Sequence, residues 1–138
     1  MDSLEKDLYG AAFRKWEISP SSKAHGYGPD GTFRTFENDF GEGEYWSYFR
    51  GNLFAINSFN MRFTKNFVLK YRCTEHLCIG FYDEIEGVTQ RQGAPLSVGA
   101  ISVYLGGEDE EYEAHVLEGA STKGTSITFS PDYYRTYL

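Results

Sequence analysis

Between Thr32 and Ser130 the sequence is a succession of short segments rich in aromatic and β-branched residues, interrupted about every 8–12 residues by Gly, Asn or Asp. Such segments favour strands, and turns at this spacing are typical of a β-barrel or a double-sheet jelly roll. We therefore expect a mainly β fold of about eight strands. The expected strands are 32–36, 44–49, 53–63, 66–72, 77–87, 97–105, 112–117 and 125–130.

Side chains alternate clearly along one of these strands. In 77–87 one face carries Leu77, Ile79 and Phe81, and the other carries Cys78, Gly80 and Tyr82. Between the strands we expect a turn at 38–43, a loop at 89–95, a polar hairpin turn at 106–111 and a Gly-rich loop before Thr125.

Both ends of the chain have helical patterns. Residues 2–15 repeat Leu4, Leu8, Ala11 and Ala12 at helical spacing, and 19–31 then reads as a loop. At the other end, Ser130-Pro131-Asp132 is a helix start, with a capping hydroxyl, a proline at the first helical position and an acid at the positive end of the helix dipole. We therefore divide the chain into an N-terminal helix and loop (1–31), a β domain (32–130) and the start of a further helix (131–138).

The composition excludes several classes of protein. The 138 residues suffice for one ordinary domain, and eleven Tyr and eleven Phe suit a β core. A net charge of −7 makes the chain by itself a poor nucleic-acid binder. It has no apolar run of about 18 residues and no basic leader, so we expect neither a membrane span nor a signal peptide, and a cytoplasmic location.

Metal and cofactor chemistry has little support in the sequence. The three histidines, His25, His76 and His115, are far apart, and we expect no metal and no cofactor. Cys73, His76 and Cys78 are close enough to contribute to a zinc site that would need a fourth ligand, and Cys73 and Cys78 would face each other if 74–77 were a hairpin loop, allowing a disulfide. Two reduced thiols that pack as small apolar residues are the favoured interpretation.

Catalytic patterns are also missing. The sequence has no G-x-S-x-G nucleophile elbow and no phosphate-binding loop. Carboxylates are plentiful, but none is marked as a catalytic pair. We therefore do not expect an enzyme.

Three segments in order resemble the N-terminal sensor domain of AraC-type transcriptional regulators: FGEGEYWSYFRGNLFAINSFNMRF (40–63), HLCIGFYDEIEG (76–87) and GTSITFSPDYYRTYL (124–138). The resemblance covers about residues 32–138. It implies a cupin-like β-barrel or jelly roll that senses a small-molecule effector, mediates dimerisation, or both. It also implies linker helices and a DNA-binding pair of helix-turn-helix motifs beyond Leu138, so that DNA is contacted only by a region missing here.

Under this interpretation the barrel holds an effector by stacking and hydrogen bonding. The candidate ligand-binding residues are Trp46, Tyr48, Tyr71, His76 and Tyr82, although strand parity alone does not settle which of them point inward. Two alternatives stay open: a stand-alone cupin-like isomerase or lyase, and a carbohydrate-binding jelly roll with exposed aromatic residues.

Overall fold

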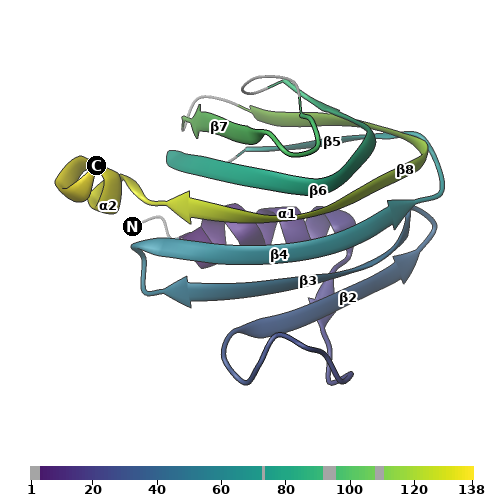
Figure 1. The fold of residues 1–138 in the computed structure, drawn as a ribbon, viewed down its shortest axis with the longest axis horizontal. Helices are drawn as coiled ribbons and strands as arrows, with labels where there is room; N and C mark the ends of the chain where they lie inside the picture. The colour runs from purple at the N-terminus through teal and green to yellow at the C-terminus, as the bar shows by residue number, and fades with distance from the viewer. Residues whose placement is uncertain (1–3, 73, 92–95, 108–110) are drawn as a thin grey trace.

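The computed structural model describes residues 4–72, 74–91, 96–107 and 111–138. In this part of the chain one antiparallel sheet of eight strands has the order β1-β2-β3-β4-β8-β6-β7, and β5 pairs with β8 (Figure 1). The expected mainly β, jelly-roll-like fold is confirmed. The elements are η1 (Leu4–Tyr9), α1 (Gly10–Trp16), β1 (Ser19–Pro20), β2 (Thr32–Asn38), β3 (Gly41–Arg50), β4 (Phe54–Phe63), β5 (Phe67–Arg72), β6 (His76–Gln90), β7 (Ile101–Gly106), β8 (Glu111–Phe129) and α2 (Pro131–Tyr137).

Two long bent strands, β6 and β8, connect the two halves of the fold. The second half of β8 pairs with β4, whereas its first half pairs with β5. The pairing of β6 with β8 shifts register between Tyr82 and Glu84 and again between Glu86 and Val88. Such irregularities bend a strand and increase its twist. The sheet therefore curls into a half-closed barrel, as Figure 1 shows.

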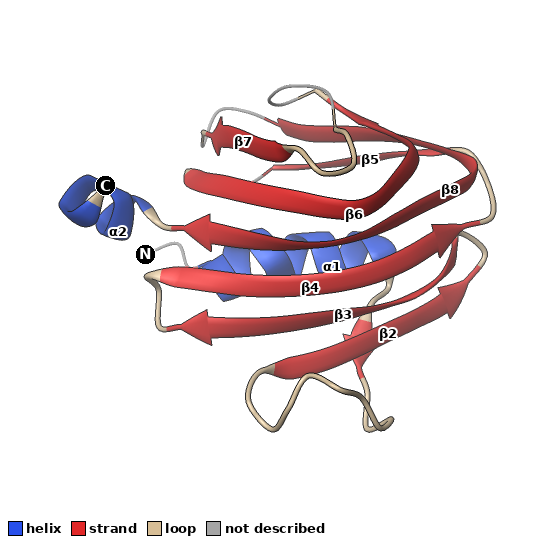
Figure 2. Cartoon of the chain, in the orientation of Figure 1, coloured by secondary structure: helices blue, strands red, loops and turns tan. Residues whose placement is uncertain are grey.

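The N-terminal helical segment packs against the sheet, beside β4 and β8 (Figure 2). Its core side chains are Leu4, Tyr9 and Phe13, each at most 8% exposed. The helix ends where Glu17 adopts a left-handed conformation (φ 56°), and Ile18 then enters the core. The helix expected over 2–15 is confirmed from Leu4 onwards, in the form of a π-helical turn followed by α1; Asp2 lies outside the described residues.

Several expected connections were wrong. The expected strands 112–117 and 125–130 are parts of one strand, β8, which ends at Phe129, and no loop separates them. Its Gly124 reads as a turn signal, but it is needed because a Cβ there would collide with the Phe81 carbonyl oxygen of β6. The turn expected at 38–43 is confirmed but is shorter, at residues 39–40. Gly41 already belongs to β3, where a side chain would strike the Arg62 backbone of β4.

The strands around β6 also differ from expectation. β7 begins at Ile101 and pairs with β6, so the acidic segment 106–111 does not close a hairpin with β8; residues 108–110 lie outside the described part. β6 continues to Gln90, beyond the expected end at 87. His76 is the first residue of β6 and not part of a turn, and β5 pairs with β8, so 74–77 is no hairpin loop between β5 and β6.

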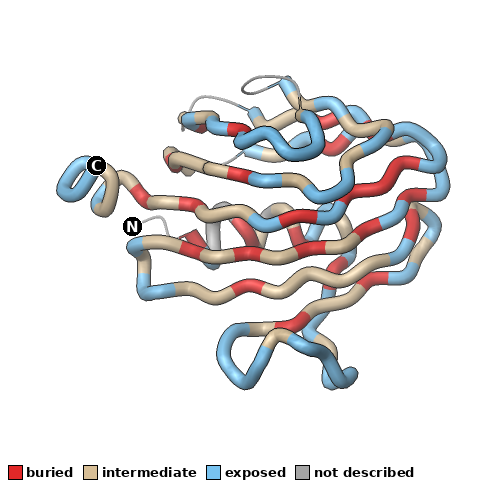
Figure 3. The backbone as a smooth tube through the Cα atoms, in the orientation of Figure 1, coloured by how far each residue is buried: buried red, intermediate tan, exposed pale blue. Residues whose placement is uncertain are grey.

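Burial alternates along the strands, as it does in β4 and β7 (Figure 3). One face of the sheet turns towards α1 and the core, and the other turns outwards. The core side chains on the inner face of β4 are Ala55, Phe59, Met61 and Phe63. Within the described residues, no helix has both the length and the apolar character needed to cross a membrane.

Helix α2 begins as the sequence predicts. The Ser130 hydroxyl accepts a hydrogen bond from the Tyr133 N–H (3.3 Å), Pro131 occupies the first turn, and Asp132 lies at the positive end of the dipole. None of the residues of α2 is buried, and the helix projects from the end of β8 (Figure 1). Its anchors to the domain are therefore few.

Candidate functional site

A cavity of about 150 Å³ lies between the helical segment and the inner face of the sheet. An apolar cavity of about this size holds a molecule as large as benzene. The helical segment contributes Tyr9, Phe13 and Trp16 to the wall. The strands contribute, among others, Tyr45, Phe59, Met61, Tyr71, His76, Cys78, Gly80, Tyr82, Ser102, Tyr104, Tyr112, Ser126 and Thr128.

A network of hydrogen bonds joins the helical segment to the inner face. The Tyr9 hydroxyl lies 2.5 Å from the Thr128 hydroxyl and accepts a hydrogen bond from Asn57 Nδ2 at 2.6 Å. The same amide nitrogen donates to Ser126 Oγ at 3.2 Å. Asn57 and Thr128 are at most 1% exposed. The polar side chains of β4 and β8 in this network therefore point into the barrel, towards the helical segment.

Some polar atoms of the site have no hydrogen-bond partner. Among the described residues, the buried side-chain atoms without a hydrogen-bond partner are Trp16 Nε1, Asn57 Oδ1 and Ser102 Oγ. Trp16 and Ser102 line the cavity. A buried polar group without a partner costs about 1–3 kcal/mol, so a bound molecule that pairs with these atoms would recover part of that free energy.

The cavity wall is uncharged at neutral pH. Its described lining has no Asp, Glu, Lys or Arg. Burial raises the pKa of Tyr82 to about 12 and raises the pKa of Tyr45 and Tyr104 well above the usual value. Burial also raises the pKa of the Cys78 thiol. An ion would lose its hydration here without a counter-charge, so the cavity suits a neutral molecule.

His76 is neutral for the same reason. The ring is 1% exposed, and burial lowers its pKa, partly offset by the hydrogen bond to the Thr74 backbone. Nδ1 lies 2.7 Å from the Thr74 carbonyl oxygen, which can only accept, so Nδ1 carries the proton. Nε2 then accepts from the Tyr104 hydroxyl at 3.4 Å. Gly106 makes room for the ring, because a Cβ there would lie 2.9 Å from Nδ1.

The structure brings three of the five predicted ligand-binding residues together. Tyr71, His76 and Tyr82 line the cavity, whereas Trp46 and Tyr48 do not. Both lie on β3 in the parity opposite to the inward-facing Tyr45. Trp46 instead donates a hydrogen bond from Nε1 to the Asp30 carbonyl oxygen (2.9 Å).

Sequence reasoning missed much of the cavity wall. Tyr9 and Trp16 come from the N-terminal helical segment, whose sequence pattern indicates a helix but not its position against the sheet. Tyr45, Ser102 and Tyr104 come from strands that were predicted. The strand pairing places these three side chains on the same face of the sheet as Cys78 and Tyr82. The sequence alone does not reveal that pairing.

The metal and disulfide hypotheses gain no support. Cys73 lies outside the described residues, and Cys78 is a free thiol. His25 and His115 are exposed, whereas His76 is buried. In the described part of the chain, no group of three or more His, Cys, Asp or Glu side chains is arranged to hold a metal ion.

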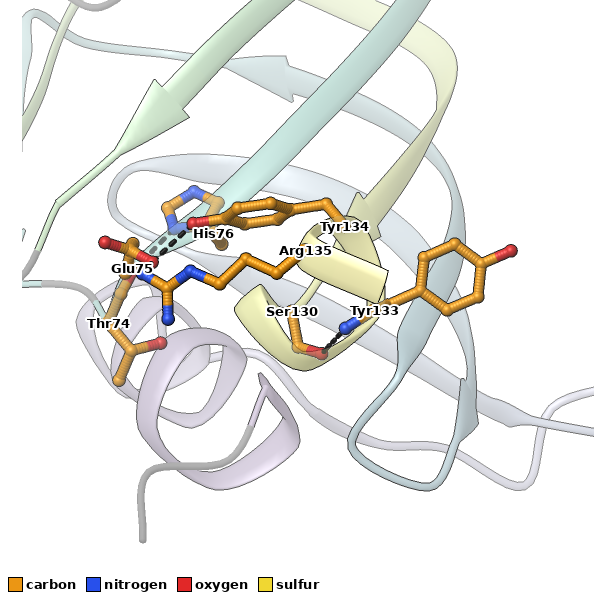
Figure 4. Close-up of polar contacts among 7 residues, drawn as sticks. All are labelled: Thr74, Glu75, His76, Ser130, Tyr133, Tyr134 and Arg135. Carbon is orange, nitrogen blue, oxygen red and sulfur yellow. Dashed lines mark hydrogen bonds and ion pairs between the residues drawn. The ribbon is translucent and has the colours of Figure 1, made fainter. Parts of the chain in front are cut away.

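A polar clamp joins the start of β6 to helix α2 (Figure 4). The Glu75 carboxylate accepts hydrogen bonds from the Tyr134 hydroxyl and from Arg135 Nη2, the latter at 2.7 Å. Glu75 directly precedes His76, whose ring lines the cavity. The residue that α2 contacts is therefore the chain neighbour of a residue in the cavity wall.

The chain was compared with known proteins. No protein-family model matches it, and no curated protein is similar to it at a significant level.

Proposed function

We propose that this domain binds a small uncharged molecule in its cavity and passes the binding event to helix α2, as the sensor domain of an AraC-type transcriptional regulator. The observation that carries the proposal is the uncharged cavity, with the unpartnered Trp16 and Ser102 atoms in its wall. The sequence resemblance of 40–63, 76–87 and 124–138 to such sensor domains supports the same function.

The route to α2 starts at His76. A ligand that displaces the Tyr104 hydroxyl from His76 Nε2 would shift the ring, which is hydrogen-bonded to the Thr74 carbonyl. Thr74 and Glu75 form the short segment that holds α2 through Tyr134 and Arg135. A ligand shifts this equilibrium only to the extent that it binds one arrangement better than the other.

The proposal includes a cytoplasmic location, a homodimer, and contact with DNA through a separate region of the same polypeptide. It predicts that the reading frame continues past Leu138 with a basic region carrying two helix-turn-helix patterns. A stop codon directly after Leu138 would contradict the regulator part of the proposal and leave the binding part intact.

Tryptophan fluorescence tests the binding part, because the chain has only two tryptophans. Trp16 lines the cavity, and Trp46 lies on the outer face. Uncharged single-ring compounds with hydrogen-bond acceptors are titrated into Trp46→Phe, in which Trp16 is the sole reporter. We expect a saturable change in emission for at least one compound.

Two matched variants complete the experiment. Trp16→Phe, which retains Trp46, should lose the signal, and Ser102→Ala should weaken binding about tenfold through the loss of one hydrogen bond. A screen without any saturable change, or a signal that persists in Trp16→Phe and vanishes in Trp46→Phe, would contradict binding in this cavity. Hydrogen exchange of the α2 amides with and without ligand then tests the route through Glu75.

A further inference from the structure

The outer face of the sheet is divided into an apolar zone and a charged zone. The strand register aligns residues across β4, β8, β6 and β7 in rows. Next to α2, three such rows contain the outer apolar patch, which consists of Phe54, Ile56, Leu77, Ile79, Phe81, Ile101, Val103, Leu105, Ile127 and Phe129. The next outward-facing row carries Asn60, Lys123 and Glu84.

The patch is exposed to an unusual degree. Ile101 is 69% exposed, Val103 51%, Leu105 58% and Phe81 42%. The other six members are half-buried. A large apolar side chain presents about 150–250 Å² when fully exposed, so the patch amounts to on the order of 700 Å². Isolated monomers rarely expose a contiguous apolar patch larger than about 300–600 Å².

This area is close to what a stable complex needs, since each partner in a typical specific interface buries about 800 Å². The end of the patch continues onto α2, where Tyr133 stacks on Phe129 with ring centroids 5.0 Å apart. A partner that covers the patch would therefore also meet α2.

We propose that the outer apolar patch is the surface through which two copies of this chain pack face to face. The patch contains no charged side chain, so a second copy about a two-fold axis packs apolar groups against apolar groups and needs no charge complement. Two such sheets pack about 10 Å apart with strands roughly aligned. A basic partner, which the net charge of −7 would attract, would find no acid within the patch.

The net charge of the chain also predicts how the affinity of the dimer depends on salt. Two copies with a charge of −7 repel each other, and salt screens that repulsion. Apolar contact is not weakened by moderate salt. The dimer should therefore be tighter at about 0.5 M NaCl than at 0.05 M, whereas a complex based on opposite charges would be weaker.

This proposal names the contact surface of the homodimer in the proposed function, and it rests only on the homodimer part of that function. Ligand sensing does not enter it. A chain that dimerises and binds no ligand contradicts sensing only, and a monomer that binds ligand contradicts this proposal only.

Sedimentation equilibrium from about 1 to 200 μM measures the association. We expect a reversible dimer for the wild type, and monomers for Val103→Lys on β7 and Ile56→Lys on β4. Leu117→Lys is the matched control, because Leu117 is a 58% exposed apolar residue of β8 outside the patch, and it should dimerise as the wild type does. Circular dichroism and thermal unfolding establish that each variant is folded; the milder Ile101→Thr, with weaker association expected, replaces any variant that is not.

Three outcomes would overturn the proposal. The first is a wild type that stays monomeric throughout this concentration range. The second is a dimer that Leu117→Lys disrupts as strongly as Val103→Lys. The third is disruption by Val103→Lys and not by a folded Ile56→Lys, because that result indicates pairing of the free β7 edges, which leaves the distant Ile56 uncovered.

Discussion

The two faces of strands β6, β7 and β8 differ in a way opposite to the usual rule for a β domain. Facing the cavity are Cys78, Ser102, Tyr104, Ser126 and Thr128. Facing outwards on the same strands are Leu77, Ile79, Val103, Ile127 and Phe129. An ordinary two-layer β protein buries its apolar side chains and exposes its polar ones.

This inversion is local. Towards the other end of the barrel, β4 has Phe59, Met61 and Phe63 inside and Asn60 and Arg62 outside, as expected. The normal end has an apolar interior, whereas the inverted end has hydroxyl, amide and thiol groups inside and the outer apolar patch outside. A polar interior costs stability unless it is hydrogen-bonded, and an apolar exterior contributes none unless it is covered. The unpartnered Ser102 hydroxyl inside and the exposed apolar patch outside are therefore better explained by binding than by folding.

The largest effect should come from the inner face of the inverted end. Asn57→Ala removes the hydrogen bonds to the Tyr9 and Ser126 hydroxyls and leaves an unfilled space in the core. We expect a loss of about 3 kcal/mol in the free energy of unfolding, measured by urea denaturation. Asn60→Ala, on the outer face of the same strand, should lose less than about 1 kcal/mol. Equal losses would mean that the inner polar network does not stabilise the fold.

A smaller loss of stability should distinguish a tyrosine near the N-terminus from one near the C-terminus. Tyr9→Phe deletes the hydroxyl that contacts Thr128 and Asn57, and we expect a loss of about 1–2 kcal/mol. Tyr137→Phe is the matched control, because Tyr137 is 69% exposed on α2 and its loss should be within about 0.5 kcal/mol. If Tyr9→Phe is as mild as Tyr137→Phe, the N-terminal helix is not fastened to the barrel by this network.

The inversion also explains what the sequence could and could not predict. Alternation in 77–87 correctly separated Leu77, Ile79 and Phe81 from Cys78, Gly80 and Tyr82. It did not indicate which set faces inwards, because the assumption that apolar residues lie inside fails at this end. The helix start at Ser130 needed no such assumption, since capping is a local interaction, and it was predicted correctly.

Long-range pairing was the second limit. Gly124 looked like a turn residue, but its lack of a side chain serves the close approach of β6, which the sequence does not reveal. The sequence predicted Trp46 as a ligand-binding aromatic residue, but it stacks on Tyr27 of the loop between β1 and β2, with ring centroids 5.7 Å apart. Nothing in the sequence marks Tyr9 as a cavity residue, because its partners Asn57 and Thr128 are distant in sequence.

The pH dependence of stability tests the polarity of the interior. Burial lowers the pKa of His76 in the folded state, whereas the unfolded chain takes up the proton near the ordinary value of about 6.5. The unfolded state therefore binds more protons below this pH, and stability should fall as the pH drops from 7.5 to 5.5. Urea denaturation at both pH values measures the difference.

Two histidine variants show whether this loss belongs to His76. His76→Gln should reduce the loss on acidification, because it removes the proton taken up by the unfolded chain. His25→Gln changes an exposed histidine that is stacked on Phe33, and it should leave the loss as in the wild type. An identical acid loss in all three proteins would show that His76 is not kept neutral by the fold.

The smallest effect should come from the outer face, where an ordinary β domain also tolerates change. Val103→Thr puts a hydroxyl on a side chain that is 51% exposed, so the monomer should change by less than about 0.5 kcal/mol, measured at a concentration too low for association. Ser102→Val, one residue earlier and facing the cavity, replaces a buried hydroxyl without a partner by a methyl group and adds a second methyl group, for which the cavity has room, and it should be neutral or stabilising. If Val103→Thr destabilised the dilute monomer by more than about 1 kcal/mol, the outer apolar patch would belong to the monomer core and not to an interface. The two variants thus test the inversion directly. If both changes are tolerated, neither the outward Val103 nor the inward Ser102 hydroxyl is needed for the fold, and both are available for binding.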